Sequence, residues 1–112
     1  MYKIDFIMIT RSGAYGTSIE LIRNNPRLQM AMGGIREQSL SVFSSKIKQT
    51  GGYGMAKLKF RLTGGDGQGT IYIELEMREN KWKPVRAILF QDFGRGEGWD
   101  VLNDLRVLEN SI

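Results

Sequence analysis

The fold is decided by residues 54–90, which read GMAKLKFRLTGGDGQGTIYIELEMRENKWKPVRAILF. Apolar and polar side chains alternate along residues 54–62 and again along residues 70–78. A period of two places one set of side chains in a core and the other in water. The glycine-rich segment GGDGQG separates these two runs, and a second turn precedes a third run that begins at Trp82. We therefore expect three consecutive antiparallel strands.

The residues ahead of this stretch predict helices and one more strand. Ile19 and Ile22 lie on the apolar stripe of an amphipathic helix, which ends before Pro26 because proline disfavours helical backbone in the preceding residue. A second short helix follows and stops at two glycines. The next segment reads as a strand with a bulge near Phe43, since its apolar side chains change faces there. The expected elements are helices at residues 14–25 and 27–32 and strands at residues 35–49, 54–63, 70–78 and 82–90.

The segment WDVLNDLRVL, residues 99–108, leaves two alternatives open. Trp99, Leu102, Leu105 and Leu108 recur at helical spacing, and a short strand is the competing interpretation. The 112 residues are expected to form a single domain, 1–112, because this length is near the common domain size. The predicted fold class is α+β, with one or two N-terminal helices packed on a roughly four-stranded antiparallel meander sheet and a C-terminal helix as an option.

The composition narrows the chemistry that this chain can perform. The sequence contains no cysteine and no histidine, so it lacks a thiolate nucleophile, the commonest general base and the commonest zinc ligands. Its formal net charge of +4 makes an anionic partner possible, although such an excess commonly serves solubility. We expect no catalytic residues, no cofactor and no metal site.

Three short motifs suggest chemistry, and each has a plainer interpretation. The loop GGDGQG leads into a strand rather than a helix, so a hairpin loop is expected and a phosphate site is not. The spacing of the carboxylates near Asp92 does not fit a calcium loop. Residues 52–58, GYGMAKL, faintly match an RNA-recognition signature whose stacking positions would be Met55 and Leu58, but the βαββαβ order of that fold is absent. We therefore expect no nucleic-acid partner.

Glycines, an Asn-Pro pair and one tryptophan recur at a characteristic spacing within residues 25–90. They are Asn25-Pro26, Met32-Gly33, Gly54, Ala56, the loop at residues 64–69 and Trp82. This spacing resembles the cytochrome c oxidase assembly protein 1 family, whose fold is akin to translocase-of-the-inner-membrane subunit twenty-one. The loop here has Gly65-Asp66 where that family usually has Pro-Lys. The resemblance implies a non-enzymatic interaction module that helps to assemble or hold membrane complexes.

The predicted function is a non-enzymatic protein-interaction or assembly-factor-like module, with a protein partner or self-association. One alternative is a small-ligand-binding α+β domain with a pocket between helix and curved sheet. A second alternative is a weak electrostatic binder of nucleic acid. No apolar run is long enough to span a membrane, although an anchor could precede this segment in a full-length protein. The compartment is left open, with a soluble cytoplasmic location favoured.

The strand register is predicted from the glycine loop. If Thr63 faces Thr70 across this loop, then Lys59 lies opposite Glu74, and Arg86 lies opposite Glu74 from the other side. The outer face of the sheet would then carry a ladder of opposite charges, and Leu58, Leu75 and Val85 would line up inside.

The same register gathers an apolar group on the outer face. A C-terminal helix could fold back and cover this group with Trp99, Leu102 and Leu105, or the group could stay open and bind a partner. The candidate partner-binding residues are Tyr72, Ile88, Phe90 and Trp99.

Overall fold

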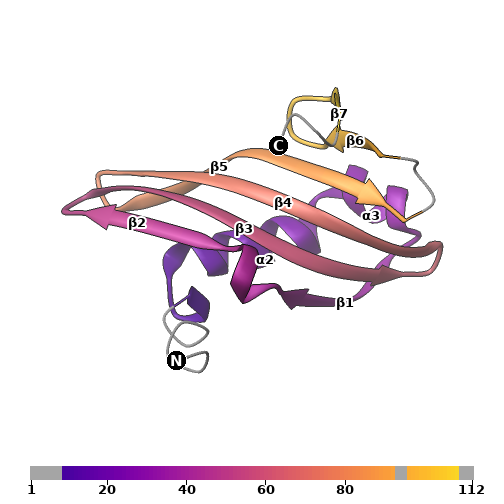
Figure 1. The fold of residues 1–112 in the computed structure, drawn as a ribbon, viewed down its shortest axis with the longest axis horizontal. Helices are drawn as coiled ribbons and strands as arrows, with labels where there is room; N and C mark the ends of the chain where they lie inside the picture. Colours follow the sequence, from indigo (N-terminus) through magenta and orange to yellow (C-terminus); the bar gives the residue numbers. More distant parts are fainter. Residues whose placement is uncertain (1–8, 93–95, 109–112) are drawn as a thin grey trace.

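The computed structural model describes residues 9–92 and 96–108 of the chain. Within these ranges two α-helices, one 3-10 turn and seven antiparallel strands form, and all seven strands belong to one sheet (Figure 1). The elements are α2 (Gly13–Asn24), α3 (Pro26–Met32), β1 (Ile35–Leu40), the 3-10 turn η1 (Val42–Ser44), β2 (Lys46–Thr50), β3 (Tyr53–Gly64), β4 (Gly67–Arg78), β5 (Lys81–Gln91), β6 (Glu97–Asp100) and β7 (Leu105–Leu108).

The expected roughly four-stranded meander is wrong, because the sheet is larger and dominates the fold. Its strand order is β1-β3-β4-β5-β6-β7, and β2 pairs with β3 beside β1. The single strand expected at residues 35–49 is two strands, since the chain turns at η1 and both halves pair with β3.

The C-terminal helix is also wrong, because residues 97–108 form the hairpin β6–β7. The carboxylate of Asp100 accepts hydrogen bonds from the backbone N–H groups of Leu102 and Asn103, at 3.1 and 3.4 Å. Asp104 adopts a left-handed backbone conformation with φ of 55°, which does not occur within a helix. The side chain of Leu108 lies outside the described part of the structure.

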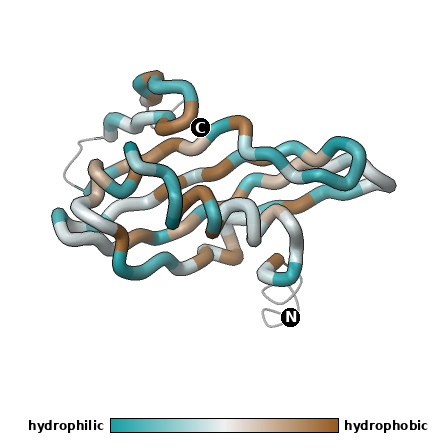
Figure 2. The backbone as a smooth tube through the Cα atoms, turned by 180° about the vertical axis from the view of Figure 1, so that it is seen from behind, coloured by the Kyte–Doolittle hydropathy of each residue, from teal (hydrophilic) through white to brown (hydrophobic). Residues whose placement is uncertain are grey.

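Both helices begin at a side-chain cap and lie on the same face of the sheet. The hydroxyl of Ser12 accepts from the backbone N–H of Tyr15 (3.1 Å), and the side chain of Asn25 accepts from that of Leu28 (3.0 Å). In Figure 1 the helices lie behind the sheet, and in the reverse view of Figure 2 they lie in front of it. On the predicted apolar stripe, Ile22 is fully buried and Ile19 is partly buried, and Leu28 of α3 is also fully buried.

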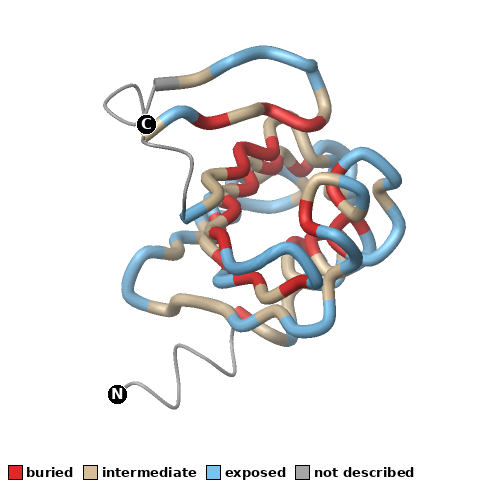
Figure 3. The backbone as a smooth tube through the Cα atoms, turned by 90° about the vertical axis from the view of Figure 1, so that its right-hand side faces the viewer, coloured by how far each residue is buried: buried red, intermediate tan, exposed pale blue. Residues whose placement is uncertain are grey.

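The core lies between the helices and the inner face of the sheet. Figure 3 shows buried residues at the centre of the molecule and exposed residues on the surrounding turns. Of the three side chains predicted to lie inside, Leu58 and Leu75 are buried and Val85 is only partly buried. Val85 forms a bulge, since Glu74 pairs with Arg86 and the next residue, Leu75, pairs with Pro84. The buried inward residues are Leu58, Phe60, Ile71, Ile73, Leu75, Ala87 and Leu89.

The predicted register between β3 and β4 is wrong by two residues. The connection is a two-residue turn in which Gly64 lies opposite Gly67, so Lys59 pairs with Tyr72 rather than with Glu74. The turn is tight because it packs against the end of α3, where the backbone N–H of Asp66 donates to the carbonyl oxygen of Met32 (3.0 Å). A shift of two residues leaves every side chain on its expected face.

Two other parts of the predicted ladder have different outcomes. The pairing of Arg86 with Glu74 is confirmed, and the guanidinium and carboxylate lie 2.9 Å apart. The inner row is wrong, because Leu58 faces Ile73 and Ile73 faces Ala87.

One end of the sheet extends beyond the helices, as Figures 1 and 2 both show. We call it the projecting end and define it as residues 46–57 and 74–86. It contains all of β2, together with parts of β3, β4 and β5. Its two turns contact each other, since the backbone N–H of Asn80 donates to the carbonyl oxygen of Gly52 at 3.0 Å.

Candidate functional site

The candidate site is the outer face of the sheet, which is turned away from α2 and α3. Residues that pair across antiparallel strands have side chains on the same face, so the register gives the rows of this surface. One row runs Lys46, Lys57, Glu74 and Arg86 across β2, β3, β4 and β5. The next row toward the projecting end runs Lys48, Met55, Glu76 and Lys83.

The lysines within residues 9–92 and 96–108 all lie on the outer face. They are Lys46, Lys48, Lys57, Lys59, Lys81 and Lys83. None of the ion pairs in this part of the chain uses a lysine, because arginines contact the carboxylates instead. The ammonium of Lys59 lies over the ring of Tyr72, 5.5 Å from its centroid. The outer face therefore carries lysine charges outside these ion pairs, although Glu74 and Glu76 lie on the same face.

Two large apolar side chains are exposed among these lysines at the projecting end. The exposed fractions are 65% for Met55 and 63% for Tyr53. They border a shallow depression of about 380 Å³, which Lys48 and Arg78 also line. Met55 was predicted only as an RNA-stacking position, and the lysines on its face were not predicted as a group. The sequence does contain a signal for this grouping. Residues 53, 55, 57 and 59 alternate along one strand, so their side chains lie on the same face.

The structure brings three of the four predicted site residues together. Tyr72 pairs with Ile88, and the rings of Tyr72 and Phe90 meet edge to face with centroids 5.9 Å apart. Strand β6 lies against them, because a Cβ atom on Gly98 would approach the Phe90 ring to 2.7 Å. Ile88 is fully buried by this arrangement, and Tyr72 and Phe90 are partly buried.

Trp99 lies apart from this group. It pairs with Leu89 and packs against the core on the inner face, and its indole N–H donates to Asp104 at 2.9 Å. Leu105 is exposed. The C-terminal segment thus returns to this part of the sheet as a hairpin, with Gly98 rather than Trp99 or Leu105 against Phe90.

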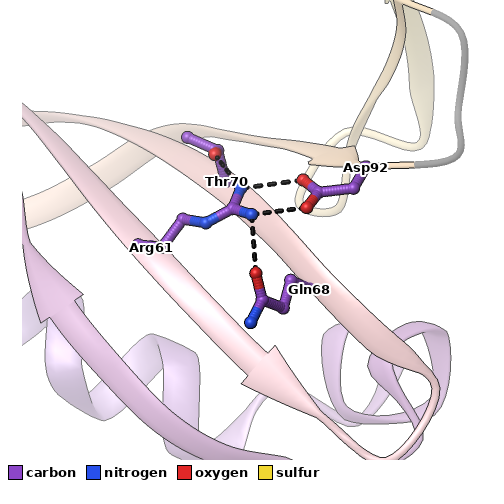
Figure 4. Close-up of polar contacts among 4 residues, drawn as sticks. All are labelled: Arg61, Gln68, Thr70 and Asp92. Atoms are coloured by element: carbon purple, nitrogen blue, oxygen red, sulfur yellow. Dashed lines mark hydrogen bonds and ion pairs between the residues drawn. The ribbon is translucent and has the colours of Figure 1, made fainter.

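A hydrogen-bonded cluster around Arg61 joins β3, β4 and the end of β5 at the other end of the outer face (Figure 4). The guanidinium of Arg61 donates to Asp92 Oδ1 (2.8 Å), to Thr70 Oγ1 (3.0 Å) and to Gln68 Oε1 (2.9 Å), and it also contacts Asp92 Oδ2. These hydrogen bonds lower the pKa of the Asp92 carboxyl and raise the pKa of Arg61. Since both terminal nitrogens of its guanidinium are already hydrogen-bonded, Arg61 ties Asp92, just after β5, to β3 and β4.

Metal-ligating groups and membrane-spanning helices can be assessed within residues 9–92 and 96–108. These residues contain no group of three or more His, Cys, Asp or Glu side chains placed to hold a metal ion. None of the helices there is both long and apolar enough to cross a membrane.

Relatives would give independent support for a function. Comparisons with protein-family models, curated proteins and solved structures gave no match, so the resemblance to the cytochrome c oxidase assembly protein 1 family stays a prediction.

Proposed function

We propose that this chain is a non-enzymatic interaction module that binds a protein partner through the outer face of its sheet. One observation supports this most directly: Met55 and Tyr53 are exposed on a face that neither α2 nor α3 covers, and Met55 lies between Lys48 and Glu76 in the register of that face. Exposed apolar side chains that are grouped and rimmed by polar ones mark interaction surfaces. Methionine suits such a surface, because its flexible side chain adapts to a partner.

The inner face supports this proposal over a ligand-binding pocket. Leu58, Phe60 and Ile73 are fully buried, and the helices pack directly on them. A small-ligand site needs a cavity with a few convergent polar groups. The residues on this side form a filled apolar core instead. The family resemblance implies the same class of function as the one proposed.

The test is affinity capture with matched methionine variants from cells that produce the protein. Met55→Glu changes the outer face, and Met30→Glu changes a methionine on the helix side that is even more exposed. We expect the wild type and Met30→Glu to retain the same protein, and Met55→Glu to lose it. Thermal unfolding of all three would confirm that each remains folded. Equal retention by all three would place the surface elsewhere, and retention of no protein by the wild type would contradict the function.

A further inference from the structure

We propose that the edge strand β2 binds an extended acidic segment of a protein partner, which joins the sheet as an additional strand. This inference rests on the proposed function and specifies its partner. Strand β2 pairs with β3 on one side, and no other strand of the described residues pairs with its opposite side. An edge strand presents alternate backbone N–H and C=O groups that another strand can bind.

The charge next to this edge selects an acidic partner. Residues 46–59 contain four lysines and no acidic residue. Lys46 pairs with Lys57 across β2 and β3, so both side chains lie on the same face. Neither lysine belongs to an ion pair of residues 9–92 and 96–108. A strand added beside β2 would place its outward side chains directly opposite Lys46 and Lys48, where carboxylates are favourable and ammonium groups are not.

The inner side of β2 adds a second requirement. Ile47 lies between the two lysines, and its side chain is partly buried against the core. Alternate residues of an added strand would lie beside Ile47 and would be apolar for the same reason. The partner segment should therefore alternate acidic and apolar residues.

The same charges disfavour a second copy of this chain as the occupant. Pairing β2 with β2 of another copy would bring the lysines of both strands onto one face. Like charges on facing strands are destabilising. Lysine on an edge strand is also a known protection against such pairing.

Nucleic acid fits this surface less well. Single-stranded nucleic acid binds where bases can stack on free aromatic faces. Lys59 lies over the ring of Tyr72, and the ring of Phe90 meets Tyr72 edge to face. Leu58, a predicted stacking position, is buried on the inner face. Among the described residues, the exposed aromatic side chains are Tyr53 in β3 and Phe43 in the turn η1 before β2, which do not form a row along one strand.

The test uses the full chain and the synthetic peptide EVEVEVEV, whose length of about eight residues exceeds that of β2. Binding would be measured by fluorescence anisotropy, and its location by backbone amide NMR shifts. We expect the peptide to bind and the largest shifts to fall in Lys46–Thr50. Lys46→Gln combined with Lys48→Gln should weaken binding by roughly tenfold, given two cross-strand charge pairs. The matched control, Arg23→Gln with Arg27→Gln on the helix side, should change it less than about twofold.

Three further probes decide between the occupants. The peptide KVKVKVKV should not bind, because its charge matches that of β2. Polyglutamate of the same length and a single-stranded DNA oligonucleotide should bind more weakly than EVEVEVEV. Equal binding of either one would overturn strand addition in favour of a general attraction for anions, or for nucleic acid.

Failure of the inference and failure of the proposed function give different results. If EVEVEVEV does not bind, or if its shifts fall away from β2, the acidic-strand inference is wrong. The capture experiment with Met55→Glu and Met30→Glu still reports on the outer face in that case, because it assumes no particular partner chemistry.

Discussion

The two ends of the sheet are held in different ways. At the end near α3, the β3–β4 turn lies directly on helix backbone: a Cβ atom on Gly64 would overlap the carbonyl oxygen of Met32. At the projecting end, a Cβ atom on Gly52 would meet Asn80 at an ordinary contact distance of 3.5 Å. The glycine-rich loop is thus a packing requirement of the fold. The candidate binding surface lies at the other end of the sheet, where the β2–β3 turn has more room, although a Cβ atom on Gly54 within β3 would approach the carbonyl oxygen of Lys48 to 2.8 Å.

The largest expected effect concerns the core beneath the α3 end. Phe60→Ala should lower the free energy of unfolding by about 3–5 kcal/mol, because Phe60 is fully buried and its removal leaves a cavity. Met55→Ala, on the same strand but exposed at the projecting end, should change it by less than about 0.5 kcal/mol. Urea denaturation measures both. A loss below about 1 kcal/mol for Phe60→Ala would remove the contrast between the two regions.

A pair of glycine variants tests the turns themselves. Gly64→Ala should destabilise the protein by about 2–3 kcal/mol, because the new methyl group meets helix backbone that cannot move freely. Gly52→Ala at the projecting end should have a clearly smaller effect. Chemical denaturation of both variants gives the comparison, and equal losses would show that the α3 end is not the more constrained one.

The C-terminal hairpin depends on one buried carboxylate. Asp100 Oδ1 accepts from the backbone N–H groups of Ala87 (3.2 Å) and Leu102 (3.1 Å). Asp100→Ala should lower the free energy of unfolding by about 1–3 kcal/mol, since it leaves buried donors without acceptors. Asp100→Asn retains an acceptor oxygen and should lose less. Thermal or urea unfolding distinguishes the two, and equal losses would argue against these hydrogen bonds.

The smallest expected effect is a dependence on pH. The folded-state pKa of Asp92 is lowered by its hydrogen bonds from Arg61, so its contribution is complete above the unfolded-state pKa of about 3.9 and is lost as pH falls through the folded-state pKa. Wild type and Arg61→Gln should therefore differ in urea midpoint at pH 5 and converge toward pH 2. Arg78→Gln, which changes an exposed and longer ion pair at the projecting end, should show no such convergence. A difference that grows with acidity would contradict the assignment.

The faces of the strands were predictable from sequence, but the pairings between them were not. Phe60 and Ile71 could be assigned to the core because alternation is a local property of the chain. The register depends on the length of the β3–β4 turn, which the contact of Asp66 with Met32 sets. The C-terminal hairpin depends on the hydrogen bond from Ala87 to Asp100, whereas the pattern within residues 99–108 left a helix and a short strand both open.

In the candidate site too, the faces of side chains were predictable and the pairings between strands were not. Tyr72, Ile88 and Phe90 were correctly grouped on one face, since a register error of two residues does not move a side chain to the other face. Trp99 was placed with them on the assumption of a covering helix, and the strand β6 puts it on the inner face. The lysine cluster was missed because it arises when β2 pairs with β3, which places Lys46 beside Lys57.

The order of the elements along the chain has a consequence during synthesis on the ribosome. The helices α2 and α3 come first, but the strands β3, β4 and β5 that bury Ile22 and Leu28 follow through Gln91. At elongation rates of about 5–20 residues per second, the apolar stripes of both helices wait several seconds for their sheet. A nascent chain of this protein therefore keeps the apolar stripes of α2 and α3 without their sheet at least until β5 has been synthesised.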